Sequence, residues 1–215
     1  MCIRDSTYTE PTIFYEYAYD TAVLAREKGL ANIFVTNGYI TDEALDEIAP
    51  LLAAANVDLK GFSEKFYREV AGATLEGVLA TLKSYRRLGI WLEITTLVIP
   101  GHNDDEESLR LIAEFIAGEL GPEVPWHITA FYPTYRLLDS PPTSVETLRR
   151  ARDMGLAAGL HYVYVGNIPG EEGEDTHCFS CNSTLIERRG FHLNGRHLQN
   201  GRCPSCHQLQ AGRWS

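Results

Sequence analysis

Short segments rich in β-branched and aromatic residues recur along this chain, and their spacing constrains the fold more than any other feature. Five of them are each bounded by Gly, Pro or Asn, as strands commonly are: residues 32–36, 57–60, 92–99, 127–132 and 161–165. Their starts lie 25 to 35 residues apart, the length of one strand followed by one helix. This alternation predicts an α/β fold with a parallel sheet, either open or closed into a barrel.

Helical patterns occupy the intervals between these segments. A helix is expected over residues 13–28, with Pro11 at its first position and Gly29 ending it. Two apolar stripes at three-to-four spacing predict further helices: Leu75, Val78, Leu79 and Leu82, then Leu109, Ile112, Phe115 and Ile116. Capping boxes are predicted at Asn103 with Glu106 and at Thr143 with Glu146.

The last forty residues contain two CxxC pairs, and together these predict a metal site. Each pair, Cys178 with Cys181 and Cys203 with Cys206, can form a tight turn, or knuckle, that directs two thiolates at one ion. Four thiolates close a tetrahedral shell, so we expect a structural zinc site, with rubredoxin-like iron as the alternative metal. Two disulfides would be strained at this spacing. Asn182 and His207 follow the knuckles, where the backbone turns left-handed.

Composition indicates one main domain and excludes some partners. With 215 residues and 44% hydrophobic content the chain can bury a full core. Its net charge of −10 divides into +4 on residues 177–215 (five Arg, one Glu) and therefore −14 on the rest. An acidic body argues against nucleic-acid binding. Apolar runs fall short of a membrane span and no signal peptide is recognised, so a cytoplasmic location without membrane attachment is expected.

The chain is predicted to have four parts. Residues 1–6 match neither a signal peptide nor a helix start and are interpreted as a non-native beginning. Residues 7–10 suggest the end of a strand leading into a helix, so residues 7–166 are expected to form the main α/β body. A linker rich in Gly and Glu follows at 167–176, and residues 177–215 form a zinc-ribbon-like module.

Polar residues cluster where the predicted strands end, which is where parallel α/β folds bind their ligands. They can hydrogen-bond a carboxylate, an amine and hydroxyl groups. The set comprises Glu10, Thr36, Asn37, Gly38, Asp58, Lys60, Thr95, Thr96, His102, Asn103, Asp104, His127, Gly166 and Asn167.

Several of these segments resemble radical S-adenosylmethionine (SAM) enzymes of the pyruvate formate-lyase activating enzyme type, and more closely those of the AmmeMemoRadiSam system. The resemblance covers nearly the whole chain from Thr7. It rests on these segments: YTEPT at 8–12, IFYEY at 13–17, VTNG at 35–38, NVDLKG at 56–61, LVIPGHND at 97–104, WHI at 126–128 and LIERRGF at 185–191. It implies a partial parallel (β/α) barrel of radical SAM type with its first strand missing.

The resemblance also implies a cofactor site. Glu10 and Pro11 stand in the place of a Gly-Gly-Glu-Pro motif whose backbone meets the methionine amino group of SAM, with Tyr8 and Thr9 replacing the glycines. Val35 stands where the activating enzyme has Asp near a cation. The residues that correspond to SAM-binding positions are Thr9, Glu10, Pro11, Thr36, Asn37, Asp58, Lys60, Thr95 and His127.

The family's cluster motif is missing from this sequence. Its members hold a [4Fe–4S] cluster with a CxxxCxxC motif, whereas four of the five cysteines here belong to the CxxC pairs and Cys2 is alone. We therefore expect a C-terminal fragment of a radical SAM enzyme that is inactive by itself. For the parent, the resemblance implies SAM and the cluster as cofactors, reductive SAM cleavage followed by hydrogen abstraction, a flavodoxin or ferredoxin as electron donor, and a protein substrate or system partner.

Two other functions fit the residues. One is a Schiff-base lyase with Lys60 as nucleophile and Asp58 or His127 as proton shuttle. The other is a non-catalytic scaffold whose zinc-bound tail docks a partner through Arg188, Arg189, Phe191 and Trp214.

Overall fold

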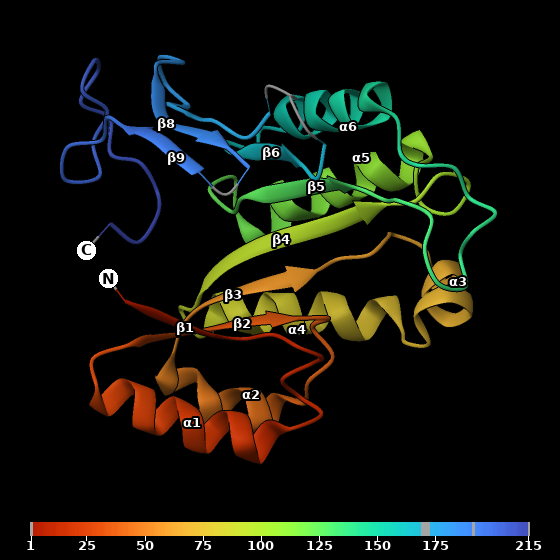
Figure 1. Cartoon of the computed structure of the whole chain (residues 1–215), viewed down its shortest axis with the longest axis horizontal. Helices are drawn as coiled ribbons and strands as arrows, with labels where there is room; N and C mark the ends of the chain where they lie inside the picture. Colours follow the sequence, from red (N-terminus) through yellow and green to blue (C-terminus); the bar gives the residue numbers. More distant parts are fainter. Residues whose placement is uncertain (1, 169–172, 191, 215) are drawn as a thin grey trace. The chain divides into compact units, whose positions relative to one another are not determined.

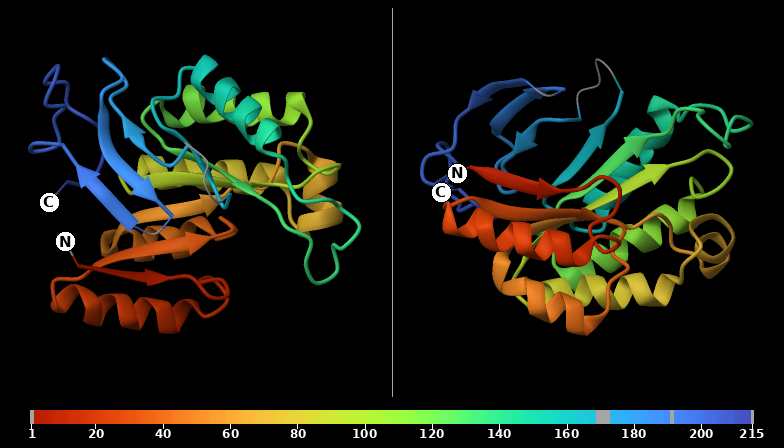
Figure 2. Two further views of the ribbon diagram at one scale, coloured as in Figure 1. Left: turned by 45° about the horizontal axis from the view of Figure 1, so that its top comes forward. Right: turned by 60° about the horizontal axis from the view of Figure 1, so that its bottom comes forward.

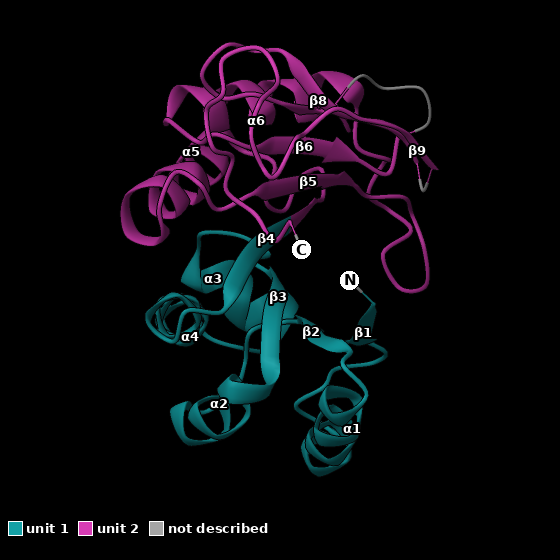
Figure 3. Ribbon diagram, turned by 90° about the vertical axis from the view of Figure 1, so that its left-hand side faces the viewer, with its two compact units in different colours: residues 1–95 teal, residues 96–215 magenta. Residues whose placement is uncertain are grey.

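A computed structural model of the chain describes residues 2–168, 173–190 and 192–214. It divides into two compact units, residues 1–95 (unit 1) and 96–215 (unit 2), and the boundary falls within strand β4 (Figure 3). Within the described residues, a six-stranded parallel sheet has the order β1-β2-β3-β4-β5-β6, and a three-stranded antiparallel sheet has the order β7-β8-β9. The predicted α/β class with a parallel sheet is therefore confirmed.

Unit 1 alternates strands with helices (Figure 1). Its elements are β1 (Ile3–Ser6), α1 (Tyr15–Glu27), β2 (Ala31–Thr36), α2 (Asp42–Ile48), a 3₁₀ turn (Ala49–Leu51), β3 (Leu52–Asp58), α3 (Glu64–Phe66), a π turn (Tyr67–Ala71), α4 (Leu75–Arg87) and the start of β4 (Trp91–Val98). Helices α1, α2 and α4 lie against one face of the strands (Figure 2). Phe34, Val57 and Ile94 point to that face and are fully buried. The opposite face carries half-buried polar residues, among them Asn56 and Asp58.

Unit 2 continues the same alternation and then changes to antiparallel pairing. Its elements are the end of β4, α5 (Glu106–Phe115), a π turn (Ile116–Leu120), β5 (Trp126–Ala130), α6 (Val145–Ala157), β6 (Val163–Gly166), β7 (Thr176–His177), β8 (Thr184–Arg189) and β9 (His192–Arg196). Trp126 is completely buried, and its indole N–H donates to the Thr96 hydroxyl at 2.9 Å. No helix in the described parts of the chain has the length and apolar character needed to cross a membrane.

All five predicted strands are present, most with ends one or two residues from the prediction, and two boundaries were further off. Strand β3 begins at Leu52, five residues before the prediction, because the run of alanines at 53–55 carries no strand signal. The N-terminal strand occupies Ile3–Ser6 and pairs in parallel with β2, whereas residues 7–10, predicted to end a strand, follow it as a loop. That residues 1–6 are non-native stays a prediction, and Met1 lies outside the described residues.

The predicted helix starts were also wrong, for a common reason. Helix α1 begins at Tyr15, not at Pro11, because Glu10 accepts the amide hydrogen bonds of Thr12 and Ile13 and holds residues 11–14 in a turn. The N-caps of α5 and α6 are Asp105 and Ser144.

The residues predicted to form capping boxes are engaged elsewhere. Asn103 accepts from the Ile99 amide and donates to the Leu97 carbonyl. Thr143 donates to the Val98 carbonyl and accepts from the Phe131 amide. Both side chains are buried at strand ends, and such sites satisfy backbone groups that water cannot reach.

The predicted linker is only partly described, since residues 169–172 lie outside the described ranges. Beyond them, Gly173 accepts a hydrogen bond from the Val165 amide, and the buried Thr176 already begins β7. The separation of residues 177–215 as a domain of their own stays a prediction, because those residues belong to the same compact unit as β5 and β6.

Candidate functional site

Glu10 is the centre of a hydrogen-bond cluster at the ends of β1 and β2. This residue is 7% exposed, and its carboxylate accepts four hydrogen bonds. Oε1 accepts from the Thr36 hydroxyl at 2.7 Å and from the hydroxyl and amide of Thr12, while Oε2 accepts from the Asn37 amide at 2.8 Å. Two predicted SAM-site residues, Thr36 and Asn37, are thus joined to a third. The carboxylate's own contacts are internal, so it positions the loop rather than presenting an open ligand group.

A second polar group lies at the end of β3. Lys60 Nζ is 2.6 Å from Asp58 Oδ2, and both side chains are more than one-third exposed. Two residues before Asp58, on the same face of β3, Asn56 Oδ1 accepts a hydrogen bond from the Thr95 hydroxyl at 2.7 Å. The buried Tyr67 hydroxyl accepts from the Lys60 amide, and burial raises the pKa of this phenol to about 12.

Asn56 was not among the predicted site residues. Because the predicted strand began at Val57, the alternation of Asn56 with Asp58 on one face of β3 was overlooked, and that alternation was the available signal.

The remaining predicted site residues are placed as follows. Thr9 is exposed in the loop after β1, and Pro11 is buried beside Glu10. His127 lies half-buried on β5, with its ring stacked on Tyr164 at a centroid distance of 5.1 Å. It belongs to unit 2, whereas the other predicted SAM contacts belong to unit 1.

Three residues of the predicted polar set have structural roles. Thr96 is fully buried and accepts from Trp126. Asn103 holds the loop after β4, as described above. Asn167 adopts a φ of 61° and donates its side-chain amide to the Ala130 carbonyl at 2.7 Å.

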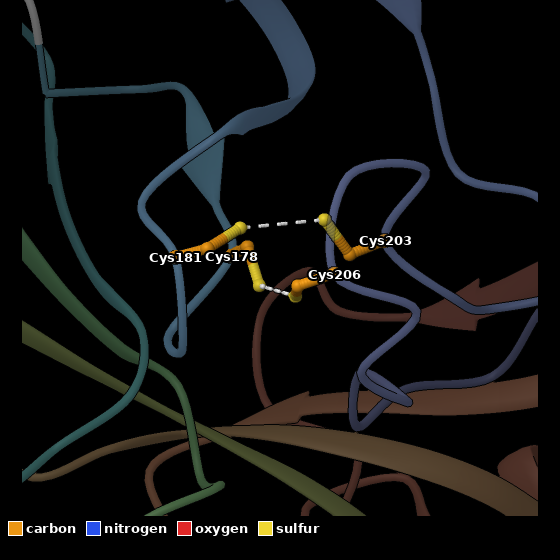
Figure 4. Close-up of side chains that lie close together, drawn as sticks. All are labelled: Cys178, Cys181, Cys203 and Cys206. Carbon is orange, nitrogen blue, oxygen red and sulfur yellow. Dashed lines mark hydrogen bonds between the residues drawn. The ribbon is translucent and has the colours of Figure 1, made fainter.

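The four tail cysteines converge on one point (Figure 4). Their sulfur atoms all lie within 4.8 Å of one another, and Cys178–Cys206 and Cys181–Cys203 are each 3.6 Å apart. Zinc bound by four thiolates at about 2.3 Å separates neighbouring sulfurs by about 3.8 Å. The quartet therefore has the size of a tetrathiolate shell.

The two knuckles share one backbone pattern. The amide of Asn182 donates to the Cys178 carbonyl, and that of His207 donates to the Cys203 carbonyl in the same way. Both residues have left-handed φ angles, 60° and 61°, as predicted. Each turn is thereby closed independently of the other, which fixes both thiol pairs toward the common centre.

The acidity of the thiols differs widely within this cluster. Hydrogen bonds from the side chain and backbone of Ser183 lower the pKa of Cys181 to about 6. A hydrogen bond from the Gln208 backbone lowers the pKa of Cys206, but burial and the neighbouring sulfurs outweigh it and raise the value to about 12. Four thiolates this close together repel one another, and a bound divalent cation offsets that repulsion. The donor set therefore fits a metal ion.

The first knuckle also forms part of a cavity of about 530 Å³ within unit 2. Its lining also includes Arg152 of α6, Leu160 after that helix, and Val163 and Tyr164 of β6. The ring of His161 stacks on that of Phe179 at a centroid distance of 4.0 Å, and this contact holds the first knuckle beside β6. Burial lowers the pKa of His161, although Glu123 partly opposes this.

Comparison with known proteins shows which class this fold resembles. Residues 6–112 match the radical SAM superfamily. The structure superimposes on a domain of pyruvate formate-lyase-activating enzyme from Bacteroides vulgatus with a TM-score of 0.68 at 18% identity, covering 78% of this chain and all of that domain. Streptococcus suis SuiB bound to S-adenosylmethionine gives a TM-score of 0.60 at 11% identity, covering 74% of this chain and 38% of SuiB. Residues 6–112 are therefore of the radical SAM superfamily.

Among individual relatives, protein MJ0808 of Methanocaldococcus jannaschii is 48% identical over 202 residues. The Escherichia coli pyruvate formate-lyase 1-activating enzyme is 24% identical over 102 residues, or 46% of this chain. The match to MJ0808 covers 93% of this chain and 60% of MJ0808. The match to the activating enzyme covers 42% of that enzyme. The expected resemblance to the activating-enzyme-like family is confirmed.

Family membership implies SAM and an iron–sulfur cluster, and the cysteines of this chain do not fit the cluster. In the described parts of the chain, the tail quartet is the only group of three or more metal-binding side chains brought together. Its CxxC pairs lack the CxxxCxxC spacing, and Cys2 is exposed and distant in sequence.

Proposed function

We propose that this chain supplies the SAM-binding half of a radical SAM enzyme of the activating-enzyme-like type. We also propose that the cysteine quartet binds a zinc ion that takes no part in catalysis. In the parent enzyme, SAM reduced by one electron from a flavodoxin or ferredoxin would supply methionine and a 5′-deoxyadenosyl radical for hydrogen abstraction from the substrate. The observation that supports this function most strongly is the family match over residues 6–112, which contains both polar clusters of unit 1.

Each residue group has a proposed role. The Glu10 cluster fixes the loop at residues 8–11, so that its backbone can meet the methionine end of SAM. Asp58 and Lys60 offer an acceptor and a cationic donor to the polar groups of the cofactor, and Thr95 adds a hydroxyl beside them. Thr36 and Asn37 complete the proposed set within unit 1, and the predicted role of His127, on β5 of unit 2, stays a prediction. The 48% identity to MJ0808 indicates a shared family, and the resemblance to AmmeMemoRadiSam enzymes suggests a system partner or a protein substrate.

Equilibrium dialysis with labelled SAM tests the binding role in this chain. We expect saturable binding, weakened at least tenfold by Asp58→Asn or Lys60→Ala. The matched control is Lys65→Ala, because Lys65 lies in α3 outside the proposed site. Absence of saturable binding by the folded chain, or equal loss in the control, would contradict the assignment.

A separate experiment tests whether this sequence is inactive by itself. After anaerobic reconstitution with iron and sulfide, we expect no SAM-responsive [4Fe–4S] signal by electron paramagnetic resonance. Such a signal from these 215 residues would show that the chain holds the cluster without a CxxxCxxC motif.

The Schiff-base lyase is less well supported than the radical SAM function. Lys60 Nζ is engaged with Asp58 Oδ2 at 2.6 Å, whereas a Schiff-base lysine attacks a carbonyl with a free amine. Borohydride trapping of Lys60 with a carbonyl compound would reverse that judgement. The docking scaffold is not favoured by a specific contact, since Arg188 bonds Thr176 and the Glu174 carbonyl and Phe191 lies outside the described residues.

A further inference from the structure

Gln210 is a buried amide that touches both the cysteine quartet and the sequence leading into β6. It is 2% exposed. Its Nε2 donates to Cys178 Sγ at 3.4 Å and to the Gln208 carbonyl at 3.0 Å, while its Oε1 accepts from the Tyr162 hydroxyl at 3.2 Å. All polar atoms of this side chain therefore have partners. One end of the amide faces a proposed metal ligand, and the other end faces the parallel sheet.

The Tyr162 hydroxyl fixes the direction of this chain of hydrogen bonds. Its oxygen accepts from the Ala211 amide at 3.1 Å, so its proton is left to donate to Gln210. Burial raises the pKa of Tyr162 to about 12, which keeps that proton in place at neutral pH. The carbonyl of the Gln210 amide must then face Tyr162, and its NH₂ group must face the sulfur.

The NH₂ group of Gln210 can only donate, and it lies 3.4 Å from the sulfur of a proposed metal ligand. Donors of this kind around a metal site orient the ligands, and their loss typically weakens metal binding about 10–100-fold.

The hydrophobic core around the quartet is too small to hold this region alone. It consists of Cys178, Leu185, Ile186 and Cys203, with Leu198 and Trp214 packed against them. Clusters of this size usually need a metal ion or a disulfide to stay folded. Among the described residues, the contacts that attach this region to β6 and the residues before it include those of Gln210 and Ala211 to Tyr162, a Tyr164–Thr176 hydroxyl pair and the His161–Phe179 stack.

We propose that the four cysteines hold a structural zinc ion and that Gln210 couples this ion to β6, so that metal binding fastens residues 176–214 to the edge of the parallel sheet. Gln210 is a positioning residue, acting through Cys178 and Tyr162. The coupling is independent of SAM chemistry and would persist if the radical SAM function failed its test.

Metal release measures this coupling directly. In the purified full chain we expect one zinc per protein by elemental analysis, with release to a chromogenic chelator 10–100-fold faster in Gln210→Met. The matched control is Gln208→Met, since Gln208 has an exposed side chain and its backbone carbonyl is retained. Less than half an equivalent of metal, or release at the wild-type rate from folded Gln210→Met, would overturn the proposal. A rubredoxin-like visible spectrum would identify iron in place of zinc and overturn the choice of metal.

A second variant protects the test against misfolding of the first. Tyr162→Phe keeps Cys178 and the Gln208 carbonyl as partners of the Gln210 amide but removes the hydroxyl through which Gln210 and Ala211 contact the residue before β6. We expect it to release zinc at a rate close to wild type, while hydrogen exchange of residues 176–214 rises and that of β2 and β3 does not change. The same local pattern is expected when wild type is treated with chelator. Unchanged exchange of residues 176–214 in both experiments would refute the fastening role.

Discussion

Replacing Glu10 by Gln tests the cluster that joins the ends of β1 and β2. An amide has one acceptor where the carboxylate has two, so one of the two oxygen positions must become an NH₂ group. At the Oε2 position that group would face the Asn37 amide, donor against donor. At the Oε1 position the hydroxyls of Thr36 and Thr12 can rotate to accept, and only the 3.3 Å bond from the Thr12 amide is lost.

The second orientation costs less, and it still exchanges charge-assisted hydrogen bonds for neutral ones. Such bonds contribute about 1.5–3 kcal/mol each when made to a charged group and about half of that when neutral. We therefore expect Glu10→Gln to lower the free energy of unfolding by about 1–3 kcal/mol, and Glu10→Ala by about 3–5 kcal/mol because all four bonds are lost.

Urea unfolding followed by far-ultraviolet circular dichroism, with hydrogen exchange of the Asn37 amide, measures both effects. The control is Thr36→Ser, which keeps the hydroxyl that donates to Glu10 and accepts from the Gly38 amide. If Glu10→Gln unfolds within 0.5 kcal/mol of wild type and Asn37 exchange is unchanged, the cluster does not hold this loop.

Two further predictions concern unit 2. Thr143→Val should lower the free energy of unfolding by about 2–4 kcal/mol, because it leaves the buried Val98 carbonyl and Phe131 amide without their partner, whereas Thr143→Ser should cost less than half as much in the same urea titration. Asp105→Ala should cost about 1 kcal/mol at pH 7 by removing the N-cap of α5. Burial raises the pKa of Asp105, but hydrogen bonds from Ser108 and nearby amides outweigh this and lower it below its ordinary value of 3.8. The capping contribution is thus present above pH 3.8 and is lost as the pH falls through the lower pKa of the folded state. The difference in unfolding free energy between Asp105→Ala and wild type should therefore shrink near pH 3. An unchanged difference would exclude the carboxylate as its source.

Sequence patterns predicted the elements with strong local signals and missed those decided by tertiary contacts. The spacing of the strands and the quartet at Cys178, Cys181, Cys203 and Cys206 carry their information in a few residue types, and both emerge in the structure. The left-handed turn at Asn182 and His207 was predictable for the same reason.

The helix starts were misjudged because a capping signature describes only local hydrogen bonding. Asn103 and Thr143 carry a capping residue's side chain, yet each satisfies strand-end backbone groups that are distant in sequence or lie in a turn. No local pattern records that competition. The Glu10 cluster was anticipated only as separate residues, since its hydrogen bonds to Thr36 and Asn37 span 26 and 27 positions.

The placement of the two knuckles at either end of the β8–β9 hairpin has a consequence for chain entropy. An ion held by Cys178 and Cys206 closes a loop of 29 residues, counted from 178 through 206. In the loop-closure relation used for disulfides, a cross-link of this length lowers the conformational entropy of the unfolded chain. The loss corresponds to about 3.6 kcal/mol of free energy relative to an unfolded chain that has released the ion. Shortening the hairpin would reduce this contribution only logarithmically. The length of this hairpin is therefore open to variation, whereas the two turns that hold the cysteines are not.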